Sequence, residues 1–271
     1  MNSLFRSLAV AAFAASLPAL IGACSSTPAN PSAPPRQPDP PPIKVQEVSP
    51  KDRAALHADL GAGYYERGQM DIALEELNEG ATLDPTNARI HNIYGLVYAM
   101  LGDNPKAEQS FQRALSLSPQ DSEIRHNWGW YLCNNGRPRE AISEFELALR
   151  NPLYRTPEVA LVNAGRCSVA LGDIAGAEVY FGRAQAIAPN NSGAAYGLAL
   201  IAFRAGRLDD ARGGMRRLMQ QTLPGPEALY LGMCIERKTA DRTAEMSYIA
   251  QLRNRYPDTI EAKAVTTGIC E

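Results

Sequence analysis

Few residues in this sequence have the type and spacing that catalysis or metal binding requires. The three histidines are His57, His91 and His126, and no two of them show the i, i+4 spacing of a helical metal site. The chain has no Gly-rich phosphate loop, no nucleophile elbow and no HExxH motif. Its many carboxylates are interpreted as solvated helix faces. The sequence therefore predicts no catalytic residue, metal, cofactor or small-molecule substrate, and the protein is not expected to be an enzyme.

The cysteines are the other reactive side chains. Beyond Cys24 there are four: Cys133, Cys167, Cys234 and Cys270. An even number of cysteines in an oxidising compartment permits two disulfides, with three possible connectivities. The alternative is that these residues are free thiols, buried as small apolar side chains.

A repeat of 34 residues sets the elements that must position these side chains. Residues 88–121 predict two amphipathic helices, with a break at Gly102 and an end at Pro119. Similar segments recur along the chain, which outranks any local signal for the fold. Four anchors return: a small residue at position 8 (Gly61, Gly95, Gly129, Gly165, Ala199, Gly232), glycine at 15 (Gly68, Gly102, Gly136, Gly172, Gly206, with Thr239 as the departure), alanine at 20 (Ala73, Ala107, Ala141, Ala177, Ala211, Ala244) and a large apolar residue at 24 (Leu77, Phe111, Phe145, Phe181, Met215, Tyr248).

Small residues at positions 8 and 20 let the two helices of a hairpin approach closely, and glycine at 15 accepts the left-handed conformation that ends the first helix. The pattern resembles the tetratricopeptide repeat. That resemblance implies an all-α, right-handed superhelical solenoid in a domain spanning residues 51–271. Two residues are inserted between repeats three and four, and one is missing before repeat six. Six repeats are expected at about 54–87, 88–121, 122–155, 158–191, 192–224 and 225–258, with a capping helix at 259–270.

The N-terminal region is organised differently. Residues 1–23 combine Arg6 with an apolar run that is short for a membrane span, which is the layout of a signal peptide. The run ends Ile-Gly-Ala before Cys24 and resembles a bacterial lipobox. The resemblance implies cleavage before Cys24, lipidation of that residue and, because Ser25 follows it, sorting to the periplasmic face of the outer membrane. The alternative is an ordinary secretory signal with a stray cysteine. Residues 24–50 are Pro-rich and are expected to form a semi-rigid tether.

Neighbour relations in the stack bear on the cysteines and on the partner. Cys133 and Cys167 fall on the first helices of consecutive repeats, so we favour that pair; Cys234 and Cys270 repeat the relation between repeat six and the cap.

The formal net charge is −2 and the sequence has no basic stripe, which argues against nucleic acid as the partner.

The remaining candidate site is the inner face formed by the first helices of repeats one to four. Trp128 is expected in the core and Trp130 on this face, where an exposed tryptophan among polar groups has the composition of a binding hot spot. Asparagines on the face offer both donor and acceptor to a bound peptide, although asparagine is also common there for local reasons. The predicted groove residues are Tyr65, Arg89, Asn92, Leu96, Met100, Asn127, Trp130, Asn134, Asn163 and Arg166.

A narrower resemblance rests on three segments: NWGWYLC at residues 127–133, NPLYRTP at 151–157 and NAGRC at 163–167. They are similar to segments of the type IV pilus biogenesis and stability lipoproteins, the PilF/PilW family. That resemblance implies an adaptor, or pilotin, that binds the pilus secretin and promotes its outer-membrane localisation and multimerisation. The alternative is a periplasmic repeat scaffold that serves β-barrel assembly or peptidoglycan hydrolases.

Overall fold

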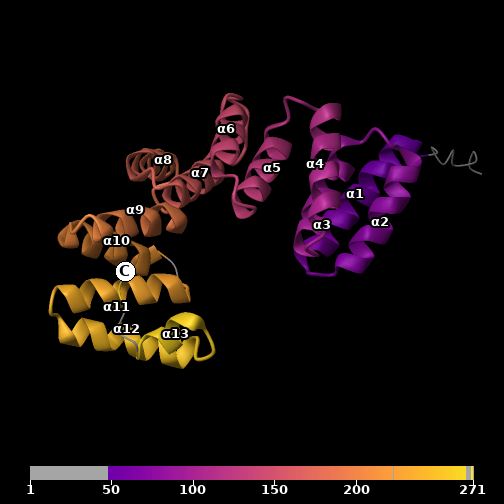
Figure 1. Ribbon diagram of the computed structural model, residues 1–271. Coiled ribbons are helices and arrows are strands. Elements are labelled where there is room, and N and C mark those ends of the chain that lie inside the picture. The colour runs from indigo at the N-terminus through magenta and orange to yellow at the C-terminus, as the bar shows by residue number, and fades with distance from the viewer. Residues whose placement is uncertain (1–47, 222, 267–269, 271) are drawn as a thin grey trace, which may run out of the picture. The chain divides into compact units, whose positions relative to one another are not determined.

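The computed structural model describes residues 48–221, 223–266 and 270, and every regular element within them is a helix (Figure 1). The predicted signal peptide, Cys24 and the tether up to residue 47 lie outside the described residues. The helices are α1 (Pro50–Glu66), α2 (Met70–Leu83), α3 (Ala88–Met100), α4 (Asn104–Leu117), α5 (Ser122–Asn134), α6 (Pro138–Leu149), α7 (Pro157–Leu171), α8 (Ile174–Ile187), α9 (Ser192–Arg204), α10 (Leu208–Gln221), α11 (Pro226–Lys238), α12 (Arg242–Arg255) and α13 (Ile260–Ala264).

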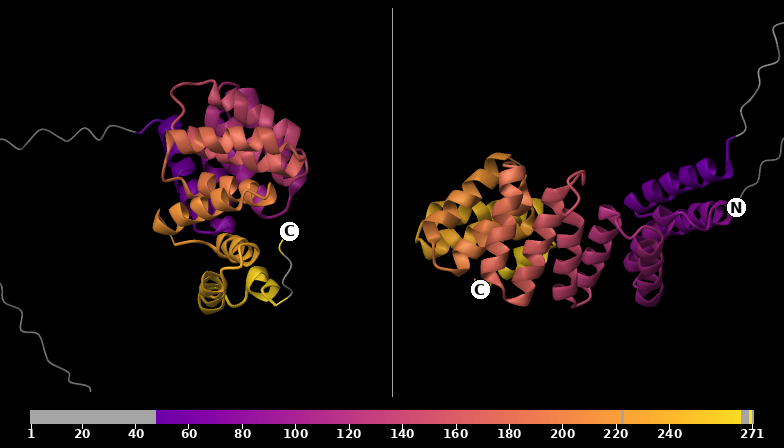
Figure 2. Two further views of the ribbon diagram at one scale, coloured as in Figure 1. Left: turned by 90° about the vertical axis from the view of Figure 1, so that its left-hand side faces the viewer. Right: turned by 90° about the horizontal axis from the view of Figure 1, so that it is seen from above.

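Helices α1 to α12 form six hairpins, each made of an odd-numbered helix and the even-numbered helix that follows it. Each hairpin packs on the next along the chain, and α13 packs on α11 and α12 (Figures 1 and 2). A single hairpin cannot bury its apolar stripe, so the neighbour completes the core. The expected all-α stack of six hairpins is therefore confirmed.

The glycine at position 8 and the large residue at position 24 meet in hairpins one to four and in hairpin six, as their spacing predicts. A Cβ atom on Gly95 of α3 would lie 2.7 Å from Phe111 of α4, well inside van der Waals contact. Phe111 and Ala107 are both fully buried. The same contact joins Gly129 to Phe145 in the next hairpin. Glycine is thus required where the two helices touch, and the aromatic ring fills the space that the glycine leaves.

The glycines at position 15 end the first helices of repeats one to five in the left-handed conformation. Their φ angles are +74° to +82°, a backbone conformation that residues other than glycine adopt only with strain. In repeat six the residue with positive φ is Ala240 at +58°, one position after Thr239.

The second helix of repeat six lies one residue later than the sequence anchors predict. The amide of Glu245 donates to the carbonyl of Asp241, as the amide of Ala211 donates to that of Arg207 one 34-residue period earlier. Glu245, not Ala244, therefore stands where the earlier repeats have alanine. The predicted pair of Gly232 and Tyr248 still meets, because a Cβ atom on Gly232 would lie 2.5 Å from the Tyr248 ring.

Glu245 can occupy that position because two arginines neutralise it. Its side chain is 3% exposed, and its carboxylate accepts hydrogen bonds from Arg237 at 2.8 Å and Arg242 at 2.9 Å. The hydrogen bond from Arg237, assisted by that from Arg242, holds the pKa of Glu245 below its usual value. A buried carboxylate without such partners would strongly destabilise the hairpin.

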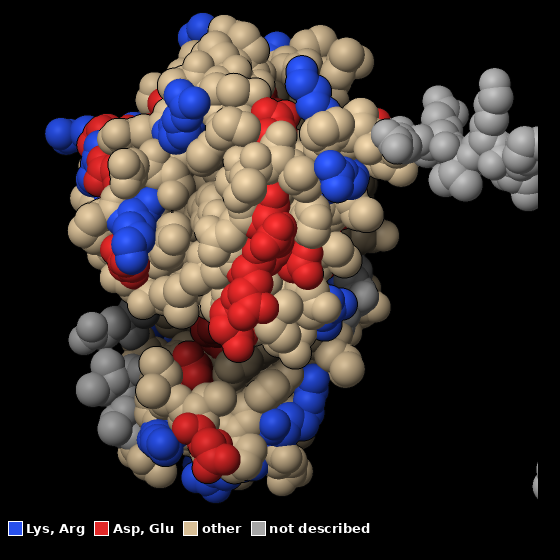
Figure 3. All heavy atoms as spheres, turned by 90° about the vertical axis from the view of Figure 1, so that its right-hand side faces the viewer, with Lys and Arg blue, Asp and Glu red and all other residues tan. Residues whose placement is uncertain are grey.

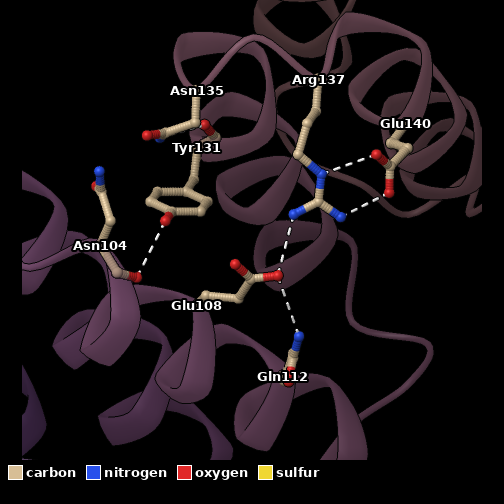
Figure 4. A network of polar contacts seen from close by, with 7 residues as sticks. All are labelled: Asn104, Glu108, Gln112, Tyr131, Asn135, Arg137 and Glu140. Atoms are coloured by element: carbon tan, nitrogen blue, oxygen red, sulfur yellow. Dashed lines mark hydrogen bonds and ion pairs between the residues drawn. The ribbon is translucent and has the colours of Figure 1, made fainter.

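Charged side chains also connect successive hairpins. Arg137, at the start of α6, donates to Glu140 of the same helix at 2.7 and 2.6 Å and to Glu108 of α4 at 3.0 Å (Figure 4). Two repeats later, Arg207 makes the corresponding ion pairs with Asp210 and with Glu178 of α8. The arginine therefore links its own hairpin to the preceding one at both junctions.

The C-terminal cap is shorter than expected. Helix α13 has five residues, from Ile260 to Ala264. Its N-cap is Thr259, whose hydroxyl accepts a hydrogen bond from the amide of Ala262. Val265 is buried in the C-terminal core, and Cys270 lies against α11 through its bond to Cys234. Val265 and Cys270 thus both belong to the C-terminal core, while the described helix ends at Ala264.

Two surface properties complete the description of the fold. No helix among the described residues is long and apolar enough to cross a bilayer. On the face that includes the first hairpin, acidic side chains gather in a band (Figure 3). Helix α2 exposes Asp71, Glu75 and Glu79 at four-residue spacing, which places them along one side of the helix.

Candidate interaction surface

Three of the four predicted groove asparagines, Asn92, Asn127 and Asn163, form hydrogen bonds to residues of neighbouring repeats. Asn127 of α5 donates its side-chain amide to the Oδ1 atom of Asn92 on α3 at 3.2 Å. Asn92 is only 3% exposed, so the expectation that it offers its amide to a partner is wrong. A buried amide needs a protein partner, and its neighbour in the next repeat supplies one. These asparagines join adjacent helices.

His126 links the inserted loop between repeats three and four to the same face. Its Nδ1 atom lies 2.8 Å from the hydroxyl of Tyr154, and its Nε2 atom lies 3.2 Å from the side-chain nitrogen of Asn163. The ring also packs edge-on against Phe145. Burial lowers the pKa of His126 from 6.5 to about 4, because the charged imidazolium would lose its hydration.

This role of His126 was missed at the sequence level, where the histidines were considered only as metal ligands. A signal was present, since Tyr154 lies in the segment 151–157, which two extra residues lengthen at this junction. The described residues contain no group of three or more His, Cys, Asp or Glu side chains placed to hold a metal ion.

The two tryptophans of α5 have different environments. Trp128 is 7% exposed and stacks on Tyr131 with ring centroids 5.4 Å apart, as expected for a core residue. The guanidinium of Arg137 lies 5.6 Å from the Trp128 ring centroid. Trp130 is half-buried, and its inner part packs against the same apolar cluster. Trp130 therefore keeps part of its ring available at the surface of repeat three.

The other predicted groove residues divide into three groups. Met100, Asn134 and Arg166 are exposed, and Tyr65 and Leu96 are half-buried against the core clusters of their own repeats. Arg89 pairs with Asp59 of α1 across the first junction, so its charge is already partnered. The structure does not gather all ten residues around one cavity.

A cavity of about 380 Å³ lies instead on the first helices of repeats four to six. We call it the C-terminal cavity; its walls and floor come mainly from Val162, Val169, Tyr196 and Leu200, with Arg166 and Glu227 at its edges. Of the predicted groove residues, Arg166 alone lines it. The available signal was the pattern Gly193, Tyr196, Gly197 and Leu200, which places all four residues on one face of α9.

The cysteines form two disulfides, each between helices or segments that are neighbours in the stack. Cys133 of α5 is bonded to Cys167 of α7, with Cα atoms 5.9 Å apart. Cys234 of α11 is bonded to Cys270, with Cα atoms 5.5 Å apart. These are the two pairings that the sequence favoured. The first of them reinforces the junction that carries the inserted loop and His126.

Comparisons with known proteins agree with this architecture. Residues 59–122, 126–192 and 168–231 match family models of the tetratricopeptide repeat. The type IV pilus assembly protein PilF of Pseudomonas aeruginosa is 25% identical over 220 residues, which are 81% of this chain and 87% of that protein. An uncharacterized protein of Haemophilus influenzae is 24% identical over 101 residues, covering 37% of this chain and 56% of that protein.

Two solved structures match almost over their full length. The crystal structure of PilW, described as a widely conserved type IV pilus biogenesis factor, is 31% identical with a TM-score of 0.72, and the match covers 79% of this chain and 98% of that one. The structure of Pseudomonas aeruginosa PilF shares the fold, with 23% identity, a TM-score of 0.73, and coverage of 81% and 99%. The chain therefore belongs to the tetratricopeptide-repeat family of type IV pilus biogenesis proteins.

Proposed function

We propose that this protein is an outer-membrane lipoprotein adaptor, a pilotin, that binds the type IV pilus secretin and promotes its localisation and multimerisation. The observation that carries the proposal is the 31% identity to the pilus biogenesis factor PilW over 98% of that chain. The two proteins thus share the whole repeat array and not an isolated repeat. A repeat array of this kind presents protein-binding surface, which is what an adaptor requires.

The membrane part of the proposal rests on Cys24 at the end of the apolar run. Burial of lipid chains contributes about 0.8 kcal/mol for each methylene, and more than one chain is needed for stable anchoring. Lipidation of Cys24 on both its thiol and its amine supplies several chains. The Pro-rich segment that follows would then hold the repeats away from the bilayer on the periplasmic side.

The binding part of the proposal centres on Trp130. Its ring packs on one side against the apolar cluster that includes Phe145, and it lies on the same helix as the exposed Asn134. A rigid, partly exposed aromatic side chain loses little conformational entropy on binding. Truncation of such a hot-spot residue typically costs 2 kcal/mol or more, roughly a thirtyfold loss of affinity.

The decisive experiment replaces the chromosomal gene with variants and measures secretin multimers, piliation and the abundance of outer-membrane barrel proteins. Gene deletion is expected to abolish secretin multimers and pili while other barrel proteins remain at normal levels. Trp130→Ala is expected to fold normally and to reduce both multimers and pili. Trp128→Ala is the matched comparison, because it removes a buried ring from the same helix and acts through stability instead.

Two results would contradict the proposal. General depletion of barrel proteins in the deletion strain would favour a scaffold for barrel assembly. Normal secretin multimers in the absence of the protein would exclude the pilotin role. The anchor is tested separately with Cys24→Ala, which is expected to leave the repeats folded and release the protein from membranes; retention of this variant in the outer-membrane fraction after a carbonate wash would refute lipidation.

A further inference from the structure

The C-terminal cavity is built by the first helices of three consecutive repeats. Helices α7 and α11 each pack on α9, and among the described residues they do not pack on each other (Figure 1). Helix α9 therefore forms the floor, and the two flanking helices form opposite walls. The volume of about 380 Å³ lies within the range of ~300–1,000 Å³ that is typical of ligand pockets.

Glycines on α9 allow the helix to pack closely on the preceding repeat. A Cβ atom on Gly197 would lie 2.5 Å from the Phe181 ring, and one on Gly193 would lie 2.9 Å from Val162. Helix α9 can therefore lie close against the preceding repeat, and its surface stays low between Tyr196 and Leu200. The result is an apolar depression with an aromatic side chain beside it.

The two walls carry opposite charges. Arg166 stands on the α7 wall and Glu227 on the α11 wall, and both residues are exposed. A smaller hollow of about 230 Å³ shares Tyr196, Leu200 and Glu227 with the cavity and adds Arg204 and Glu261. The charged groups of Arg166, Arg204, Glu227 and Glu261 form no ion pair with any other described residue. Across the same two junctions, by contrast, Arg207 pairs with Glu178 and Arg212 pairs with Glu236.

Tyr196 lies beside these charges, because it lines both the C-terminal cavity and the smaller hollow. Burial raises the pKa of the Tyr196 hydroxyl, Glu227 and Glu261 raise it further, and Arg166 and Arg204 lower it. All four charged groups thus act on one phenol. The hydroxyl of Tyr196 makes no hydrogen bond to another described residue, which leaves it available to an incoming polar group.

We infer that the C-terminal cavity docks an extended segment of a partner protein that places one large apolar side chain on α9, an acidic residue against Arg166 and a basic residue against Glu227. Charge complementarity selects this occupant. A lipid chain would leave both walls unpaired, and a uniformly charged ligand would meet repulsion from one of them. In an extended segment, alternate side chains point the same way, so the two charges lie two residues before and two residues after the apolar anchor.

This inference can be tested separately from the secretin proposal, because Trp130 does not line the cavity and Arg166 is the one predicted groove residue that does. Trp130 variants test the secretin surface, and Tyr196 variants test the cavity. The two surfaces lie on different repeats, and a protein that lost one could retain the other. A negative result with the cavity variants would therefore contradict the cavity proposal alone, and a negative result with Trp130→Ala would contradict the secretin surface alone.

The test selects peptides without assuming their sequence. A phage-displayed library of random heptapeptides is selected on the full mature protein, with counter-selection on Arg166→Glu. The expected result is enrichment of peptides with an acidic residue, a large apolar residue and a basic residue at alternate positions, in one of the two directions. Enrichment of no peptide, or of peptides without this pattern, would overturn the inference.

A fluorescein-labelled copy of the most enriched peptide then provides a quantitative charge-swap test by anisotropy. Tyr196→Ala is expected to weaken its binding roughly thirtyfold, as for an aromatic hot spot. Arg166→Glu is expected to weaken it about tenfold, and replacing the acidic residue of the peptide by lysine should restore most of that loss. Arg217→Glu on α10, an exposed arginine outside the cavity, is the matched control and should bind as wild type does. Equal binding to wild type and Arg166→Glu, or no rescue by the charge swap, would refute the site.

Discussion

The buried histidine at the junction of repeats three and four makes the stability of the protein depend on pH in a calculable way. The pKa of His126 is about 4 in the folded protein and 6.5 for an ordinary histidine. Between these values the unfolded chain binds a proton that the folded protein does not bind. The free energy of unfolding therefore has its full value above pH 6.5 and decreases as the pH falls below that value. Below pH 4 the histidine is protonated in both states, and its titration causes no further decrease.

The size of the effect follows from the two pKa values. At pH 5, His126 is almost fully protonated in the unfolded chain and only about one-tenth protonated in the folded protein. The resulting loss of unfolding free energy between pH 7.5 and pH 5 is about 2 kcal/mol, and the limit at lower pH is about 3 kcal/mol. Carboxylates whose pKa is held low, such as Glu245, lose their contribution mainly at still lower pH.

The perturbation is His126→Gln, which retains a side chain able to hydrogen-bond to Tyr154 and Asn163 but does not titrate. Urea unfolding is measured at pH 7.5, 6.5, 5.5 and 5.0 with both disulfides intact. Wild type should lose about 2 kcal/mol across this series, and the variant should lose far less. His91→Gln is the control, because among the described residues His91 hydrogen-bonds only to the carbonyl of Pro85 and does not contact His126. The loss that His126 causes should therefore persist in this variant. The same pH dependence in His126→Gln and wild type would refute the reasoning.

Three further predictions concern stability. Trp128→Ala should lower the unfolding free energy by about 3–5 kcal/mol, measured by urea denaturation, whereas Trp130→Ala should melt near wild type; equal melting of the two would place Trp130 in the core. Removal of the Cys133–Cys167 bond by a double serine substitution should lower the free energy of unfolding by about 4 kcal/mol, because the bond closes a loop of 34 residues. An unchanged denaturation midpoint would show that the bond does not form in the protein. Gly95→Ala should destabilise by about 1–3 kcal/mol through overpacking against the aromatic anchor, and an increase in thermal stability would show that the two helices can separate without cost.

The repeat architecture could be predicted from sequence because its causes are local and recur. Gly95 faces Phe111 across a hairpin, and the same pair of residue types recurs at the same spacing in other repeats. A steric requirement that is repeated along the chain leaves a visible period, so the number of hairpins and the core position of Trp128 followed directly. The pairing of Cys133 with Cys167 also followed, because residues one repeat apart on first helices are neighbours in any such stack. The pairing of Cys234 with Cys270 was favoured on the expectation of a longer capping helix, whereas α13 ends at Ala264 and Cys270 lies beyond it.

Repeat six shows where the pattern misleads. Ala244 matched the small anchor by residue type, but the backbone hydrogen bonds place Glu245 there. A carboxylate is tolerated at that buried position because Arg237 and Arg242 converge on it from the surrounding helices. The two arginines meet Glu245 only in the folded protein. Residue type alone therefore selected Ala244, one position too early.

The interaction surfaces were decided mostly by tertiary structure. Asn92 reads as a groove residue by its position in the repeat, yet its hydrogen bond to Asn127 of the next repeat buries it. The C-terminal cavity was not predicted, because it depends on how far α7 and α11 stand apart across the glycines of α9. Sequence periodicity determines which residues face inward on one helix. The distance between helices, which decides whether those residues meet each other or a partner, is set by packing across three repeats at once.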